Sequence, residues 1–78
     1  MENFYFNGTY RNDKGYPIAH YYHAKVTRGS LREFYNVDVV IFDKHDGEPF
    51  DGYIRLVPMN EYTPKEAASA VVTNPDQF

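Results

Sequence analysis

Residues 33–42, EFYNVDVVIF, decide the fold of this chain. β-branched residues dominate the run and favour a pleated strand over a helix. Val40 and Phe42 add apolar surface to a second face, so we expect the end of this strand to be covered on both sides. The two-residue repeat of a strand predicts that its main apolar face consists of these residues: Tyr35, Val37, Val39 and Ile41.

Two further strands are predicted before this central run. Residues 3–10 form one, with Phe4, Phe6 and Tyr10 on one face, although Phe4-Tyr5-Phe6 fits burial of either face. Residues 12–15, Asn-Asp-Lys-Gly, predict a tight turn because these residue types tolerate positive φ. Residues 18–27 form the next strand. Gly8 marks a bulge or a close backbone approach.

The chain after the central run predicts a loop, a strand and a helix. Residues 43–52 contain two Asp-Gly pairs and favour a loop, and residues 53–57 return as a fourth strand. Thr63 and Glu66 fit a capping box around Pro64, which predicts a helix over residues 64–72. A helix of this length must dock on the sheet or on a partner, because it is not stable alone in water.

These elements predict an α+β fold: a four-stranded, mainly antiparallel meander with one short C-terminal helix packed on one face. Residues 1–73 would form a single domain, and residues 74–78 a flexible tail. The predicted core consists of Phe4, Phe6, Ile18, Tyr22, Val26, Val37, Val39, Ile41, Ile54, Leu56, Ala67 and Val71.

Composition narrows the class of protein. The 78 residues include eight Tyr and six Phe but no Cys, so disulfides and thiolate metal sites are excluded. Residues 1–32 carry five bases against two acids, and residues 33–78 carry three against nine, which gives +3 and −6. We expect a cytoplasmic protein, because the N-terminus has no signal-peptide pattern and the apolar run at residues 39–42 is too short to cross a bilayer.

Catalytic and metal chemistry find little support. His20 and His23 lie three apart and would point to opposite faces of a strand, so they could not share an ion. His45 stands in the acidic segment 43–51, whose spacing does not match a calcium loop. Asp46 and Asp51 would need a pocket to act as an acid–base pair. We therefore expect no enzyme activity, no cofactor and no metal.

A contact surface is the better-supported expectation. Tyr, Phe and Arg commonly anchor interfaces, and one short helix leaves a sheet face uncovered. The hypothesis is a module that binds or inhibits another protein, as phage and mobile-element regulators of similar composition do, or that forms homo-oligomers. The alternative is a single-stranded nucleic-acid binder that stacks bases on Tyr beside Lys and Arg. The candidate partner-binding residues are Tyr5, Tyr10, Arg11, Tyr21, Lys25, Arg32 and Tyr35.

Overall fold

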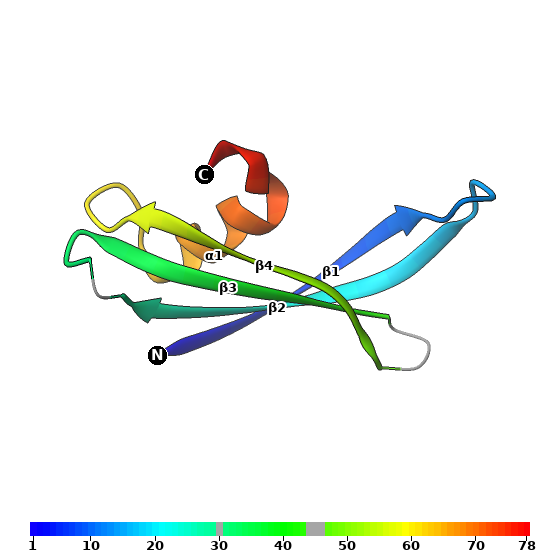
Figure 1. Ribbon diagram of the computed structural model, residues 1–78, viewed down its shortest axis with the longest axis horizontal. Helices are drawn as coiled ribbons and strands as arrows, with labels where there is room; N and C mark the ends of the chain where they lie inside the picture. The colour runs from blue at the N-terminus through cyan, green and yellow to red at the C-terminus, as the bar shows by residue number, and fades with distance from the viewer. Residues whose placement is uncertain (30, 44–46) are drawn as a thin grey trace.

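Four antiparallel strands form one sheet, and a helix follows them (Figure 1). The computed structural model describes residues 1–29, 31–43 and 47–78, with the backbone alone at Tyr10. The sheet order is β1-β2-β3-β4, which confirms the α+β meander. The elements are β1 (Glu2–Arg11), β2 (Pro17–Arg28), β3 (Phe34–Asp43), β4 (Pro49–Pro58), α1 (Pro64–Thr73) and the 3₁₀ helix η1 (Pro75–Gln77).

The turn between β1 and β2 follows from its sequence. The Asn12 side-chain oxygen accepts hydrogen bonds from the backbone N–H groups of Lys14 and Tyr16, both at 3.0 Å. Gly15 has a φ of 83°, in the left-handed region that glycine adopts without a Cβ clash. The predicted turn at residues 12–15 is confirmed, and it sets the register of the first hairpin.

That register places alternate residues of all four strands on one side of the sheet. Phe4 pairs with Ala24, Ala24 with Val39, and Val39 with Tyr53. Phe4 and Phe6 therefore face the core, which answers the question of register in β1. We call this side, against which α1 packs, the covered face. The buried apolar core is made of Ala24, Val26, Val37, Val39, Ile41 and Val57 from the sheet with Ala67, Ala68 and Val71 from α1.

Helix α1 begins at the predicted capping box. The Thr63 hydroxyl accepts from the Glu66 N–H at 3.2 Å, and the Glu66 carboxylate accepts from the Thr63 N–H at 2.9 Å. Ala67, Ala68 and Val71 form its buried stripe, and the two small alanines let the helix approach the strands closely. The helix ends one residue later than predicted, at Thr73.

The helix covers only part of its side of the sheet. Its ten residues measure about 15 Å, whereas a ten-residue strand extends about 33 Å. In Figure 1 the helix lies beside the left-hand half of the sheet, and the strand pairs β1–β2 and β3–β4 extend beyond it to the right. The distal part of the covered face carries His20, which is 2% exposed and has its ring against Tyr22 and Phe50.

Strand β4 departs from the sequence prediction. Ile54 and Leu56 were expected in the core but are 61% and 44% exposed, on the side away from α1. Val57 and Tyr53 take the inner positions, because Tyr35 pairs with Val57 and Val39 with Tyr53. Residues 53–57 have apolar side chains on both faces of the strand. Only pairing with β3 therefore decides that Tyr53 and Val57, and not Ile54 and Leu56, face the core.

The loop before β4 is also shorter than predicted. Strand β4 begins at Pro49, so residues 49–52 belong to the sheet, with a register shift next to Phe42. Gly47 turns the chain with a φ of 73°, whereas Gly52 has no positive φ. A Cβ at Gly52 would lie 3.0 Å from the Val39 carbonyl oxygen, so this glycine permits a close strand approach and makes no turn.

Gly8 serves a related purpose on β1. A Cβ there would lie 2.9 Å from Tyr22 Cε2 and 3.0 Å from His20 Nε2. The close approach therefore comes from two side-chain rings that lean over the strand, and the β1–β2 register continues through Gly8 without a bulge. Ile18, also expected in the core, is only half-buried near the β1–β2 turn.

The C-terminal residues fold back beside β4. Arg55 Nε donates to the Pro75 carbonyl oxygen at 2.9 Å, and the Phe78 ring meets the Tyr62 ring edge-to-face at 5.8 Å. Residues 74–78 were expected to be a flexible tail. They include the 3₁₀ helix η1 and make defined contacts with Arg55 and Tyr62. The mobility of this segment and the domain boundary at residue 73 stay predictions.

Candidate functional site

The side of the sheet away from α1 carries a group of aromatic and aliphatic side chains. We call this side the open face, and it follows directly from the strand register. Tyr5 pairs with His23 and His23 with Val40, while Asn7 pairs with Tyr21 and Tyr21 with Phe42. The middle of the open face consists of Tyr5, Tyr21, His23, Val40, Phe42, Gly52, Ile54 and Leu56, together with the polar residues Asn3, Asn7, Lys25, Thr27, Asn36 and Asp38.

Two stacked ring pairs shape this face. Tyr5 stacks on His23 with ring centroids 4.8 Å apart and an interplanar angle of 7°. Tyr21 stacks on Phe42 at 5.2 Å and 14°. His23 Nε2 also forms a 2.8 Å hydrogen bond with the Asn3 side-chain oxygen, which holds the imidazole in place. Cross-strand ring pairs of this kind stabilise a sheet and also form a firm contact surface.

The most exposed apolar groups lie on the two outer strands. Tyr5 of β1 is 70% exposed, and Ile54 and Leu56 of β4 are 61% and 44% exposed. Gly52 lies in the same row as Tyr5, at the opposite edge, and contributes no side chain. The open face therefore has a projecting ring at one edge and a depression at the other.

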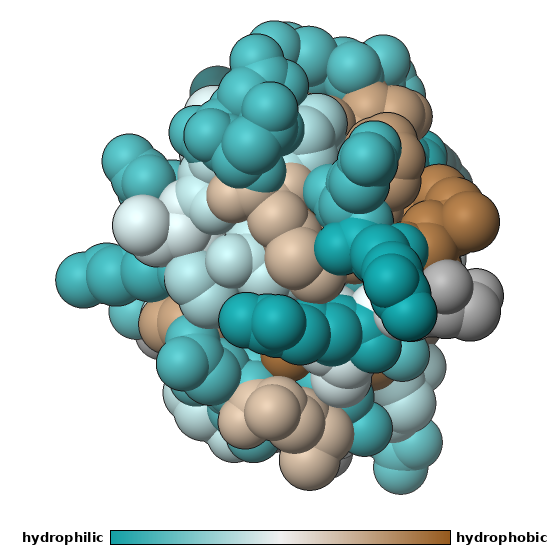
Figure 2. Space-filling view, turned by 90° about the vertical axis from the view of Figure 1, so that its left-hand side faces the viewer, coloured by the Kyte–Doolittle hydropathy of each residue, from teal (hydrophilic) through white to brown (hydrophobic). Residues whose placement is uncertain are grey.

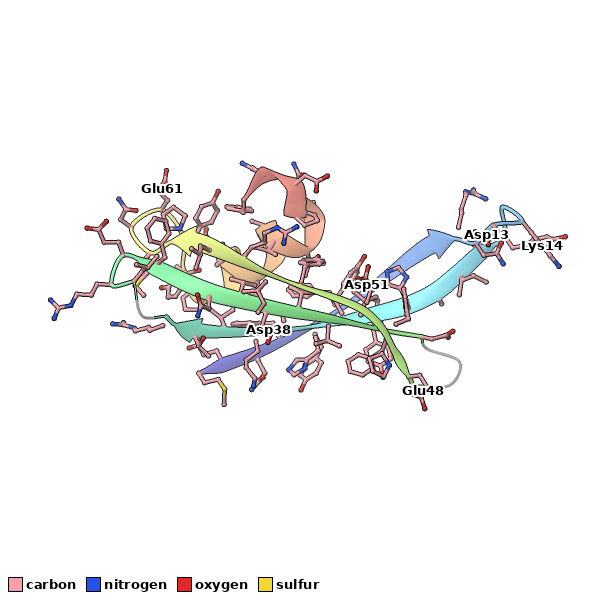
Figure 3. All side chains as sticks on the ribbon, in the orientation of Figure 1. Asp13, Lys14, Asp38, Glu48, Asp51 and Glu61 are labelled. Carbon is pink, nitrogen blue, oxygen red and sulfur yellow. The ribbon has the colours of Figure 1, made fainter. Side chains whose placement is uncertain are left out.

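Charge is sparse and balanced in the middle of the open face. Lys25 and Asp38 occupy paired positions on β2 and β3, so a cation and an anion lie side by side. Figure 3 shows other charged side chains far from this pair: Asp13 and Lys14 at the tip of the first hairpin, and Glu61 at the opposite end.

The structure brings some of the predicted site residues together. Tyr5, Tyr21 and Lys25 lie on the open face as neighbours, and Arg11 lies at the far end of the same side. Arg11 donates to the Gly15 carbonyl oxygen at 2.7 Å, so its described contact is within its own hairpin.

The remaining predicted site residues lie elsewhere. Tyr35 is on the covered face and packs against the core. The backbone of Tyr10 pairs with Ile18, and its side chain is outside the described atoms. Arg32 lies in the connection between β2 and β3, where it lines a hollow of about 480 Å³ with Glu33, Phe34, Pro58, Met59 and Asn60.

Figure 2 looks at the end of the molecule that carries this hollow. Hydrophilic residues dominate the view, and the hydrophobic areas on it are small and separate. Glu33 lines the same hollow as Arg32, so its carboxylate would oppose the binding of an anion by Arg32.

Sequence reasoning missed the contribution of β4 to the open face. Ile54 and Leu56 were assigned to the core, and their true side follows from pairing with Asp38 and Asn36. The available signal was the apolar second face of the central strand. Val40 and Phe42 indicated that this second face would carry apolar residues, including those of the strand that follows.

Among the described residues, the two titratable groups with a shifted pKa, Tyr53 and Glu66, lie away from the open face. Burial, reinforced by the nearby Tyr22 phenol, raises the pKa of the Tyr53 hydroxyl on the covered face. The hydrogen bonds from Thr63 lower the pKa of the Glu66 carboxyl at the helix start. Both shifts follow from structural contacts.

Within residues 1–29, 31–43 and 47–78, no cluster of three His, Asp or Glu side chains has the arrangement of a metal site. His20 lies on the covered face and His23 on the open face, as the strand repeat predicts. His45 and Asp46 are outside the described residues, so the expectation that the 43–51 segment holds no metal and forms no acid–base pair stays a prediction.

In the described part of the chain, no helix combines the length and the apolar character needed to cross a bilayer. Searches against family models, curated proteins and solved structures found no match to the chain. The geometry of the open face is therefore the basis for a functional proposal.

Proposed function

We propose that this chain is a non-enzymatic protein-interaction module that binds a protein surface through the open face of its sheet. One observation carries the proposal: Tyr5, Ile54 and Leu56 stay exposed at the two edges of a face whose middle holds two stacked ring pairs and one pair of opposite charges. Contiguous exposed apolar surface on a small domain is typical of a binding site. Inhibition or regulation of the bound protein is the form of activity that such a module would have.

The stiffness of the face supports this proposal. Its side chains stand on a four-stranded sheet, and the stacked pairs Tyr5–His23 and Tyr21–Phe42 restrict the rings. Restricted side chains lose little conformational entropy on binding, so more of the contact energy remains as affinity. Aromatic residues held in this way are common anchors of interfaces.

The charge of the face favours protein over single-stranded nucleic acid. Phosphate binding needs a groove with several cations, whereas Lys25 here lies beside Asp38. The Tyr5 ring could stack on a base, but Asp38, two strands away on the same face, would repel phosphates that follow the chain across the sheet. The proposal also places the protein in the cytoplasm, where a cysteine-free chain is at no disadvantage.

Affinity capture with matched variants tests the proposal. The wild type, Ile54→Asp and Leu31→Asp are immobilised and exposed to an extract of the source cells. Ile54 lies on the open face, whereas Leu31, 52% exposed, lies in the connection between β2 and β3. We expect a protein that the wild type and Leu31→Asp retain and that Ile54→Asp loses, with the same order of affinities after the partner is purified.

Random oligonucleotides are titrated against the same three proteins at low and high salt. Binding that falls steeply with salt and is unaffected by Ile54→Asp would contradict the proposal in favour of nucleic acid. Retention of nothing by the wild type, together with no self-association at high concentration, would show that the open face is not a binding surface.

A further inference from the structure

We propose that the open face binds a second copy of this chain, with the two sheets packed face to face about a two-fold axis that runs along the strands between β2 and β3. This inference rests on the proposed function and names its partner. It follows from the strand order, from the positions of Lys25 and Asp38, and from the projecting and recessed positions on the outer strands β1 and β4.

The strand order defines what such an axis brings together. Rotation about an axis that lies between the sheets, parallel to the strands, places β2 over β3 of the second copy and β1 over β4. Residues that are paired across the four strands form a row. The rotation places each row over the same row of the second copy, with the order of the strands reversed. The interface is isologous, so every contact occurs twice.

The row of Lys25 and Asp38 is self-complementary under this rotation. Lys25 would face Asp38 of the second copy, and Asp38 would face its Lys25, which places four charges in alternation around the axis. A partner of one sign would instead leave either Lys25 or Asp38 against a like charge. Close pairs of opposite charge fix the register of an interface, whereas like charges oppose it.

The next row matches in shape. Tyr5, 70% exposed on β1, would lie over Gly52 of the second copy, where β4 has no side chain. His23 would lie over Val40, and in the row beyond it Tyr21 would lie over Phe42. The projecting Tyr5 ring thus meets the depression at Gly52, as close packing requires.

Sheet twist is compatible with these contacts. Packed sheets cross at about 30°, and β1 and β4 lie about 7 Å from the axis, so their residues shift by roughly 4 Å relative to the untwisted arrangement. A Tyr side chain can span this shift. The charged row is closest to the axis and is displaced least.

The area of the face suits a dimer. Four strands of ten to twelve residues outline roughly 33 by 19 Å, or about 600 Å² per copy, and a specific interface needs a total of about 1,000 Å². Since twist separates the corners, the contact lies at the lower end of this range. We expect dissociation constants on the order of micromolar.

Sedimentation of charge-reversed variants tests the arrangement. The wild type should pass from 9.1 kDa to twice that mass as concentration rises through the micromolar range. Lys25→Asp and Asp38→Lys each place two pairs of like charges across the axis and should weaken the homodimer at least about tenfold. An equimolar mixture of the two variants should restore a dimer of wild-type affinity, because both cross-axis pairs become opposite again.

Matched variants separate the interface from the fold. Lys14→Asp reverses a charge at the hairpin tip, and Tyr16→Ala removes a ring that is 63% exposed outside the open face. Neither should change the dimer, whereas Tyr5→Ala should weaken it. Circular dichroism of each variant at low concentration confirms that the monomer is folded. Rescue in the mixture cannot come from a monomer, so it excludes an effect within one chain.

A wild type that stays monomeric up to about 1 mM, well above the expected dissociation constant, would overturn the second-copy proposal. A dimer that tolerates Lys25→Asp, or that the mixture fails to restore, would overturn it as well. Either result is compatible with the proposed function if the wild type captures a protein other than this chain and Ile54→Asp does not. The proposed function fails separately, if neither self-association nor such capture depends on the open face.

Discussion

The two faces of one sheet both carry aromatic and aliphatic side chains, but the open face has more polar residues and the environments are opposite. On the covered face, Ala24, Val37, Val39 and Val57 are fully excluded from water. On the open face, Tyr5 and Ile54 are 70% and 61% exposed. The difference comes from one short helix, which can bury only one side of a four-stranded sheet. Apolar character along a strand therefore shows where burial would be favourable, and the rest of the chain decides where it occurs.

The strongest test of this comparison uses two neighbouring valines. Val39 faces α1 and is fully buried, whereas Val40 faces the other way and is half-buried. Val39→Ala should lower the free energy of unfolding by about 2–3 kcal/mol, because it leaves a cavity in the core. Val40→Ala should cost less than about 1 kcal/mol, since water can fill the space.

Urea denaturation at low protein concentration measures both values. Equal losses at the two positions would mean that the faces are buried alike within a monomer. A loss for Val40→Ala that grows with protein concentration would instead support burial of the open face by a second copy.

A second pair on β4 compares residues of opposite character. Arg55 lies on the covered side over the Tyr53 ring, 4.9 Å from its centroid, and holds the Pro75 carbonyl oxygen. Arg55→Ala should cost about 1–2 kcal/mol, because it removes a charged hydrogen bond and a cation–π contact. Ile54→Ala should change monomer stability by no more than about 0.5 kcal/mol, although Ile is the more apolar residue.

The same pair has a structural readout. In NMR spectra, Arg55→Ala should weaken the cross-peaks between the Tyr62 and Phe78 rings, which meet at 5.8 Å, whereas Ile54→Ala should leave them unchanged. Intact cross-peaks in both variants would show that the C-terminal residues dock without the guanidinium.

The helix start offers a smaller test of what keeps one face covered. Thr63→Ala removes the hydroxyl that accepts from the Glu66 N–H and should cost about 1 kcal/mol. Hydrogen exchange should then speed up in α1 and at the amides of β3 beneath it. Exchange that changes in α1 alone would show that the covered face stays closed without a well-formed helix start.

The smallest expected effect is a dependence on acid. The folded-state pKa of Glu66 lies below its ordinary value of 4.5, so its contribution is complete above that pH and is lost as pH falls through the lowered pKa. Glu66→Gln, which keeps an oxygen acceptor but no charge, should therefore lose less of its thermal midpoint than the wild type between about pH 5 and pH 3. Parallel melting curves of the two proteins across this range would contradict the assignment.

Much of the fold was predictable because it depends on local patterns. The alternation in residues 18–27 and 33–42, the Asn12–Gly15 turn and the Thr63–Glu66 capping box each depend on neighbours in sequence. Strand β4 was not predictable in the same way. Ile54 and Leu56 form the more apolar face of β4, because Arg55 lies between Tyr53 and Val57 on the other. Pairing with β3 nevertheless places Tyr53, Arg55 and Val57 on the covered side.

Some residues of the candidate site were likewise predictable from local patterns, and others were not. Tyr5, Tyr21 and Lys25 could be assigned to one side from the first hairpin alone, since its turn sets their register. The contribution of β4 required the complete sheet. Arg32 lies at one end of the molecule and Tyr35 on the covered face, so similar residue types were separated by position.

The sequence by itself determined the strands, the first turn, the helix start and the α+β class, because two-residue alternation and capping act over a few residues. Tertiary structure alone decided which side of β4 is buried, where residues 74–78 lie and which apolar side chains remain in water. These outcomes depend on pairing between distant strands and on the reach of a ten-residue helix, and neither is encoded in a local pattern.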